Sequence, residues 1–81
     1  MRNTKHNFYK GKKVLVTGGT GLIGRPLVEM LIEAKAKVRI ASLDDRSRAH
    51  PQAKFLRVDL TDINNCLKAC KGMDYVFHLA V

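Results

Sequence analysis

Short runs of consecutive apolar residues alternate with helical stripes along this chain of 81 residues. The first run, residues 13–17, is rich in β-branched side chains and stops at a pair of glycines. Similar runs over 38–41, 55–58 and 74–81 predict three further strands. Because the runs are continuously apolar instead of alternating, they favour strands buried on both faces, as in a parallel sheet.

Two segments between the strands change to the helical period. The first helix is predicted from Leu22 to about Ala34, with a small distortion at Pro26. Its predicted apolar stripe consists of Ile23, Leu27, Met30, Leu31 and Ala34. The second helix follows Thr61, whose side chain can cap it, and stops at Gly72 in a left-handed conformation. Its predicted inner face consists of Ile63, Cys66, Leu67 and Cys70.

The order of these elements is strand, helix, strand, loop, strand, helix, strand. Such alternation predicts an α/β fold: a Rossmann-type doubly wound parallel sheet of strand order 3-2-1-4, with the ligand crevice above strands 1 and 4. Residues 43–54 are polar and lack a helical stripe, so they are predicted as a loop with at most one irregular turn. Residues 1–12 are predicted as a flexible basic lead-in, and residues 13–81 as the N-terminal part of one domain.

Composition and charge narrow the possible partners. Hydrophobic residues make up 46% of the chain and charged residues 27%, an ordinary composition for a folded domain. The net charge of +8 is concentrated before Val14, in a segment without a nucleic-acid-binding motif, so we expect no nucleic-acid partner. No apolar run approaches the roughly 20 residues that span a membrane, and no export signal follows the basic start. We therefore expect a cytoplasmic protein without membrane contact.

The spacing of the cysteines does not indicate a metal site. Cys66 and Cys70 are the two cysteines of the chain, and no histidine lies near them in sequence. A pair with this spacing is a poor zinc signal, so we predict reduced thiols that pack like small hydrophobic side chains. No metal ligands are predicted.

Three glycines with the spacing G-x-x-G-x-x-G carry the candidate chemistry. Gly18 lets the chain leave the strand in a tight turn, Gly21 lets a phosphate approach the backbone, and Gly24 lets the new helix pack against the strand. The unpaired N–H groups near Leu22 and Ile23 then face the pyrophosphate of a dinucleotide, whose negative charge the helix dipole favours. A turn without a ligand is the alternative. A P-loop is excluded because no Gly-Lys-Ser/Thr follows.

From about residue 12 to residue 81, the sequence resembles the extended short-chain dehydrogenase/reductase family, the NAD-dependent epimerase/dehydratases. The resemblance rests on residues 14–24, the second strand, Asp59-Leu60 and residues 75–80. It implies that the Asp59 side chain and the Leu60 backbone hold the adenine ring. It also implies that Leu79 and Ala80 line the cofactor on its ribose and nicotinamide side. A cap at the strand end is the alternative role for Asp59, and His78 is assigned no role.

The second strand departs from the family's NAD pattern. Family members selective for NAD end this strand in an acid that binds the ribose hydroxyls, and Ser42 stands at that position here. Asp44 and its neighbour Asp45 follow, at the distance from the glycines expected of the acid. Ser42 together with Arg46 or Arg48 would instead accommodate a 2′-phosphate. The predicted cofactor is NAD, with NADP open.

The family's catalytic residues are not recognisable in this chain. Its redox chemistry uses a Tyr-x-x-x-Lys pair downstream of the fourth strand. Tyr9 and Lys13 have that spacing but precede the first strand, so we interpret them as a coincidence. The chain is expected to be a fragment, inactive alone and with a bare hydrophobic edge at the fourth strand. No catalytic residue is assigned.

Three functions are compatible with these features. The leading one is the NAD(P)-binding portion of an epimerase, dehydratase or related oxidoreductase whose substrate is a nucleotide sugar or another polar small molecule. The second is a non-catalytic NAD(P)-binding sensor or scaffold protein of the same fold. The third is a nucleic-acid binder that uses the basic lead-in. The oligomeric state is left open.

Overall fold

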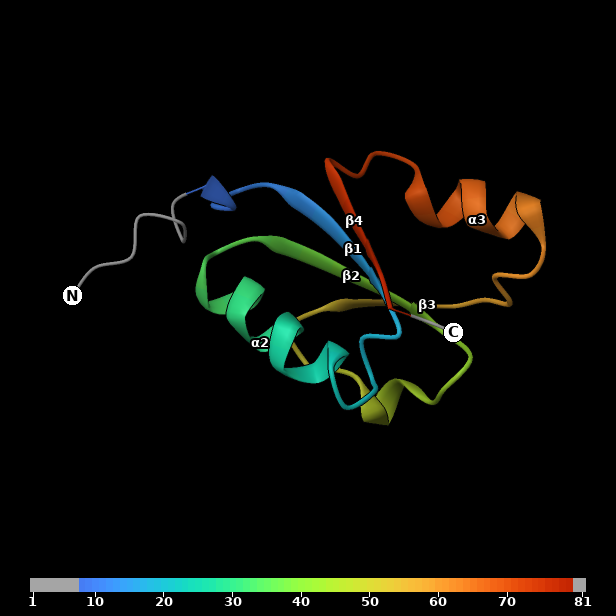
Figure 1. Cartoon of the computed structure of the whole chain (residues 1–81), viewed down its shortest axis with the longest axis horizontal. Coiled ribbons are helices and arrows are strands. Elements are labelled where there is room, and N and C mark those ends of the chain that lie inside the picture. The colour runs from blue at the N-terminus through green and yellow to red at the C-terminus, as the bar shows by residue number, and fades with distance from the viewer. Residues whose placement is uncertain (1–7, 80–81) are drawn as a thin grey trace.

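The computed structural model describes residues 8–79 and contains a parallel sheet of four strands (Figure 1). The strands are β1 (Lys13–Thr17), β2 (Lys37–Ser42), β3 (Lys54–Arg57) and β4 (Tyr75–His78). Their order is β3-β2-β1-β4, which confirms the predicted topology. Residues 1–7 and 80–81 lie outside the described residues, so the lead-in predicted over 1–12 stays a prediction.

The two helices cover opposite faces of the sheet (Figure 1). α2 (Gly24–Glu33) connects β1 to β2, and α3 (Ile63–Cys70) connects β3 to β4. Val14 and Val16 of β1 pack into the cluster on the α2 side, whereas Leu15 packs with Ala41 and Ala69 on the α3 side. Since successive strand residues point to opposite faces, β1 must be apolar at every inner position. All three side chains are at most 1% exposed, as the continuous apolar run predicts.

The predicted stripe of α2 is correct in part. Leu31 and Ala34 are buried and Leu27 is half-buried, but Ile23 and Met30 are exposed. Val28, which the stripe omits, is 1% exposed. The helix begins at Gly24, two positions later than Leu22, and Gly24 is packed against the glycine turn. That contact sets the rotation of the helix and directs residues 24, 28 and 31 toward the sheet.

The predicted cap and inner face of α3 need correction. Asp62, and not Thr61, is the N-cap: its side chain accepts a hydrogen bond from the Asn64 N–H at 2.8 Å. Ile63, Leu67 and Cys70 are exposed, Cys66 is half-buried and Ala69 is fully buried. The small Ala69 side chain faces Leu15 and Ala41, which places the bulky apolar residues of the helix away from the sheet. Gly72 has φ +78°, which confirms the left-handed stop.

The connection over residues 43–54 contains one short 3₁₀ helix, η1 (Arg46–Arg48), in agreement with the predicted irregular turn.

Both cysteines are free thiols. Cys66 donates a hydrogen bond to the Leu60 carbonyl at 2.9 Å, but Cys70 is exposed, so the prediction that both pack as hydrophobic side chains is wrong for Cys70.

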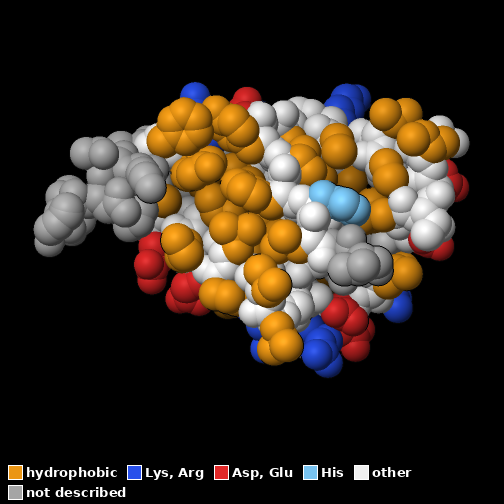
Figure 2. Space-filling view, viewed as in Figure 1, with side chains coloured by type: hydrophobic (Ala, Val, Ile, Leu, Met, Phe, Trp, Pro, Cys, Tyr) orange, Lys and Arg blue, Asp and Glu red, His pale blue; other side chains and the backbone are white. Residues whose placement is uncertain are grey.

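β4 forms one edge of the sheet, as predicted. Tyr75 and Val76 are 37% and 48% exposed. Tyr75 joins an aromatic cluster with Phe8, Tyr9 and Phe77, whose ring centroids lie 5.0–6.3 Å apart. Figure 2 shows hydrophobic side chains gathered over the face where β4 and α2 lie.

Among residues 8–79, no helix is long and apolar enough to cross a membrane.

Candidate functional site

Gly18 and Gly24 are required by the fold itself. Gly18 follows β1 with φ +75°, a conformation that residues with a Cβ rarely adopt. A Cβ on Gly24 would lie 2.0 Å from the Gly18 carbonyl oxygen and 2.7 Å from the Gly19 Cα, distances that real Cβ atoms do not show. The start of α2 therefore packs backbone against backbone on the turn that follows β1, as the glycine spacing predicts.

Gly21 has no comparable reason within the chain to be glycine. Its φ is not in the left-handed region, and among the described residues a Cβ there would meet a single atom, the Gly18 carbonyl oxygen, at an ordinary 3.5 Å. Its N–H donates to the same oxygen at 3.1 Å. A side chain at this exposed position would therefore occupy open space in front of the turn. This is the geometry expected where an external group approaches the backbone.

The start of α2 offers backbone donors to solvent. Its N-cap, Ile23, makes no side-chain capping hydrogen bond, and the first turn contains no acidic residue. Leu22 and Ile23 are 97% and 73% exposed. Within the described residues, no hydrogen bond uses the backbone N–H of Leu22 or Ile23. These donors and the positive end of the helix dipole suit an anion.

A cavity of about 330 Å³ lies at the carboxyl ends of the strands. Its lining includes Gly18, Ser42, Asp59, Leu60 and His78, which come from the ends of all four strands or from the segments that follow them. The structure therefore brings together residues from four separate blocks of the sequence. A crevice at this edge of a doubly wound sheet is the usual place for a ligand.

Other predicted site residues stand beside this cavity or outside the described part. Gly21, Leu22, Ile23 and Gly24 form the turn and helix start that follow Gly18. Leu79 lies just beyond β4, where its N–H donates to the carbonyl and the hydroxyl oxygens of Thr17, both at 3.0 Å. Ala80 lies outside the described residues.

The geometry of Asp59 is compatible with both roles considered for it, a cap at the strand end and a contact with a ligand. Its Oδ1 accepts hydrogen bonds from the Thr61 hydroxyl at 2.7 Å and the Thr61 N–H at 2.9 Å, so it caps the turn after β3. Among the described residues its Oδ2 has no partner and can accept from a ligand. The Thr61 hydroxyl, and then the Thr61 N–H, hold the pKa of Asp59 below its ordinary value of 3.8. The carboxyl group is therefore ionised throughout the neutral range.

Thr61→Val is expected to raise the pKa of Asp59 toward 3.8, because it removes the stronger of these two hydrogen bonds. An NMR pH titration of the Asp59 carboxyl carbon measures the change, with Thr61→Ser as the control that keeps the hydroxyl. Because the folded-state pKa is lowered, the stabilisation by this turn is present above the unfolded pKa and is lost as the pH falls through the lowered value. An unchanged pKa in Thr61→Val would exclude the hydroxyl as the cause.

The end of β2 is fastened to the glycine turn. The Thr20 hydroxyl, in a residue only 5% exposed, donates to Asp44 Oδ2 at 2.5 Å. The Asp44 N–H donates to Ser42 Oγ at 3.0 Å. Thr20 was not among the predicted site residues. The signal that would have found it is a hydroxyl within the glycine turn, at a position where an acid after β2 can reach it.

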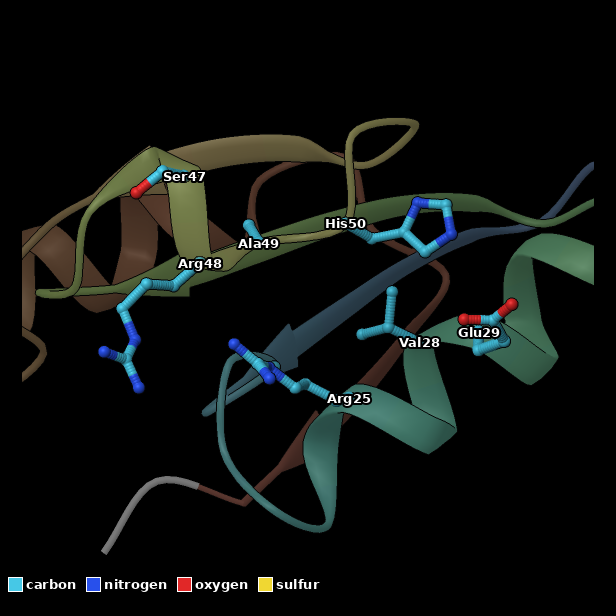
Figure 3. A pocket seen from close by; sticks show the side chains of 8 residues that line it. Arg25, Val28, Glu29, Ser47, Arg48, Ala49 and His50 are labelled. Carbon is cyan, nitrogen blue, oxygen red and sulfur yellow. The ribbon is translucent and has the colours of Figure 1, made fainter.

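The two arginines considered for a 2′-phosphate differ in their contacts. Arg46 donates to the carbonyl oxygens of His50, Pro51 and Ala53 at 3.2, 3.1 and 2.9 Å. Its guanidinium group is therefore held by hydrogen bonds to the loop before β3. Arg48 lines a second cavity, of about 270 Å³, together with Arg25 and Gly19. Figure 3 shows Arg25 on α2 and Arg48 at the end of η1, the two elements that flank this cavity.

His78 has a structural partner. Its Nδ1 lies 2.7 Å from the Thr17 hydroxyl, across the pairing of β1 with β4. When His78 carries its proton on Nε2, Nδ1 accepts this hydrogen bond and the Thr17 hydroxyl donates it. In the part of the chain that the structure describes, no three His, Cys, Asp or Glu side chains are placed to share a metal ion.

The sequence of the chain was compared with models of known protein families and with known proteins. The model of the NAD dependent epimerase/dehydratase family matches residues 14–81. The chain is 42% identical over 71 residues to the 3β-hydroxysteroid dehydrogenase/Δ5→4-isomerase of Mycobacterium tuberculosis, covering 84% of this chain and 19% of that protein. It is 33% identical over 81 residues to the UDP-glucose 4-epimerase of Rickettsia bellii, covering 85% of this chain and 24% of that protein.

Solved structures agree with this assignment. The epimerase Mth375 of Methanothermobacter thermautotrophicus has a TM-score of 0.81 at 35% identity, over 95% of this chain and 25% of that one. The enzyme WbmF of Bordetella bronchiseptica, in complex with NAD⁺ and UDP, has a TM-score of 0.76 at 29% identity, over 91% of this chain and 24% of that one. The chain thus spans about a quarter or less of the length of these relatives.

Proposed function

Since the chain belongs to the NAD dependent epimerase/dehydratase family, we propose that it binds NAD as the cofactor-binding part of an epimerase, dehydratase or related oxidoreductase. The observation that carries this proposal is Gly21, a glycine that the fold does not need. It stands in front of backbone donors that have no partner within the described residues. A bound pyrophosphate accounts for both features.

Each part of the cofactor has residues suited to it. Gly18, Gly21, Leu22, Ile23 and Gly24 form the turn that would hold the pyrophosphate. The Oδ2 of Asp59, which has no partner within the described residues, and the backbone of Leu60 would bind the adenine ring from the 330 Å³ cavity. Leu79 and Ala80 would line the ribose and nicotinamide side, although Ala80 lies outside the described residues.

The ribose end favours NAD. Ser42 stands where NAD-selective relatives carry an acid, and its hydroxyl accepts the Asp44 N–H, so the acid two positions later is held close to it. Asp44 Oδ1 is unused within the described residues and can accept from a ribose hydroxyl. Arg46 is committed to loop carbonyl groups and does not serve a 2′-phosphate.

The residues of this chain bind and orient the cofactor; the hydride chemistry belongs to the nicotinamide when it is bound. Tyr9 and Lys13 have the spacing of the family's catalytic pair, but Lys13 begins β1 at the amino end of the sheet, opposite the cavity. Catalytic groups and a site for a nucleotide sugar or another polar substrate are proposed for the remainder of the full-length enzyme. The named relatives include both a steroid dehydrogenase and a UDP-glucose epimerase, so this part does not select the substrate.

An NMR titration of the ¹⁵N-labelled 81-residue chain tests the binding. NAD⁺ at millimolar concentration is expected to shift the amide signals of residues 21–24, 42–44 and 59–60. Signals at the amino ends of the strands, such as Lys37 and Lys54, should stay in place and serve as the internal control. Absence of shifts with NAD⁺ and also with NADP⁺ would contradict the proposed function.

A further inference from the structure

We infer that Thr20 is a positioning residue: it holds Asp44 at the ribose end and thereby sets the preference for NAD over NADP. This inference rests on the proposed function. It concerns a residue that the glycine spacing does not single out, between Gly18 and Gly21.

The contacts of Asp44 carry the first step. The carboxylate accepts the Thr20 hydroxyl through Oδ2 at 2.5 Å, and the Asp44 N–H donates to Ser42 Oγ at 3.0 Å. An exposed aspartate would otherwise exchange between rotamers in solvent. Held at both its side chain and its backbone, Asp44 keeps one orientation relative to the glycine turn. Its Oδ1 stays available within the described residues.

The burial of Thr20 carries the second step. The residue is only 5% exposed, and its hydroxyl donates to the Asp44 carboxylate. A hydrogen bond to a charged group is stronger than one between neutral groups, and a buried hydroxyl without a partner is unfavourable. The turn that is proposed to hold the pyrophosphate therefore also determines where the acid lies.

Two arginines that line the cavity beside Gly19 carry the third step. Arg25 and Arg48 line the neighbouring 270 Å³ cavity with Gly19, and Glu29 is the acid among its lining residues (Figure 3). Within residues 8–79 neither guanidinium group has an ion-pair or hydrogen-bond partner. A fixed Asp44 repels a 2′-phosphate, while the two arginines attract it. Release of Asp44 would therefore shift the balance toward NADP.

Thr20→Val tests this inference because valine keeps the shape of threonine and removes the hydroxyl. We expect the ratio of the NADP⁺ to the NAD⁺ dissociation constant, measured by NMR titration, to fall roughly tenfold, the scale of one hydrogen bond to a charged group. Thr20→Ser is the matched control and should restore the ratio. Asp44→Asn should lower it to a similar extent, and Thr20→Val should add little in the Asp44→Asn background.

The possible results separate this inference from the proposed function. A wild-type chain that binds neither dinucleotide contradicts the proposed function. A wild-type chain that prefers NAD⁺, with equal losses for both dinucleotides in Thr20→Val, contradicts the positioning role alone, because general damage to the turn changes both affinities together. If Thr20→Val loses its folded spectrum, Thr20→Ala and Asp44→Asn provide the comparison, and an unchanged ratio in either contradicts the inference.

Discussion

Replacing Gly24 by alanine is expected to lower the free energy of unfolding by about 3 kcal/mol or more. The new Cβ would lie 2.0 Å from the Gly18 carbonyl oxygen and 2.7 Å from the Gly19 Cα, so backbone must move on both sides of the contact. The affected elements are β1, one of the two interior strands, and α2, which covers one face of the core. Urea denaturation followed by circular dichroism measures the loss.

Gly21→Ala is the matched control for this experiment. Its Cβ meets one backbone oxygen at 3.5 Å, an ordinary contact, and its φ lies outside the left-handed region. An alanine there also reduces the conformational entropy of the unfolded chain, so the stability should stay equal or rise slightly. Equal denaturation midpoints for Gly24→Ala and the wild type would show that the close contact between the start of α2 and the end of β1 is absent.

Replacing Gly21 by valine is expected to weaken NAD⁺ binding roughly 100-fold or more while the chain stays folded. The branched side chain would fill the space in front of the turn and keep the pyrophosphate from the N–H groups of Leu22 and Ile23. Loss of two hydrogen bonds to a charged group corresponds to a change of this size. The NMR titration used for the wild-type chain measures it, and the amide spectrum reports the fold.

The comparison of Gly21→Val with Gly24→Ala gives the sharper test. The two positions are three residues apart in one turn, yet the first variant should lose the ligand and the second should lose stability. If Gly21→Val binds NAD⁺ with unchanged affinity, the turn does not hold the pyrophosphate. In that case Gly21 would have no explanation in either the fold or the ligand.

Secondary structure and topology were predictable because they depend on local patterns. The apolar run at residues 13–17 is long enough for one strand and ends at a glycine pair, and the structure has β1 within the same bounds. The alternation of strands and helices then leaves few topologies, and the strand order followed from it. Gly72 also behaved as predicted, since a left-handed residue at a helix end strongly favours glycine.

The faces of the helices were less predictable. Periodicity shows that a helix has an apolar stripe, but several rotations are compatible with it when apolar residues are numerous. In α2 the contact of Gly24 with the turn favours the rotation in which Val28 is buried and Met30 is exposed. In α3 the close approach at Ala69 left Ile63 and Leu67 exposed.

The chain's own chemistry was sufficient to predict a parallel doubly wound sheet and a glycine turn suited to a phosphate, whereas the family came from the resemblance of its motifs to known proteins. These features reside in short segments, where backbone freedom, side-chain branching and the spacing of glycines act between neighbours. The contacts among Thr20, Asp44 and Ser42, the commitment of Arg46 to loop carbonyl groups, and the shared cavity of Gly18, Ser42 and Asp59 required the folded structure. Such contacts join residues from different elements, and their distances follow only from how the whole sheet packs.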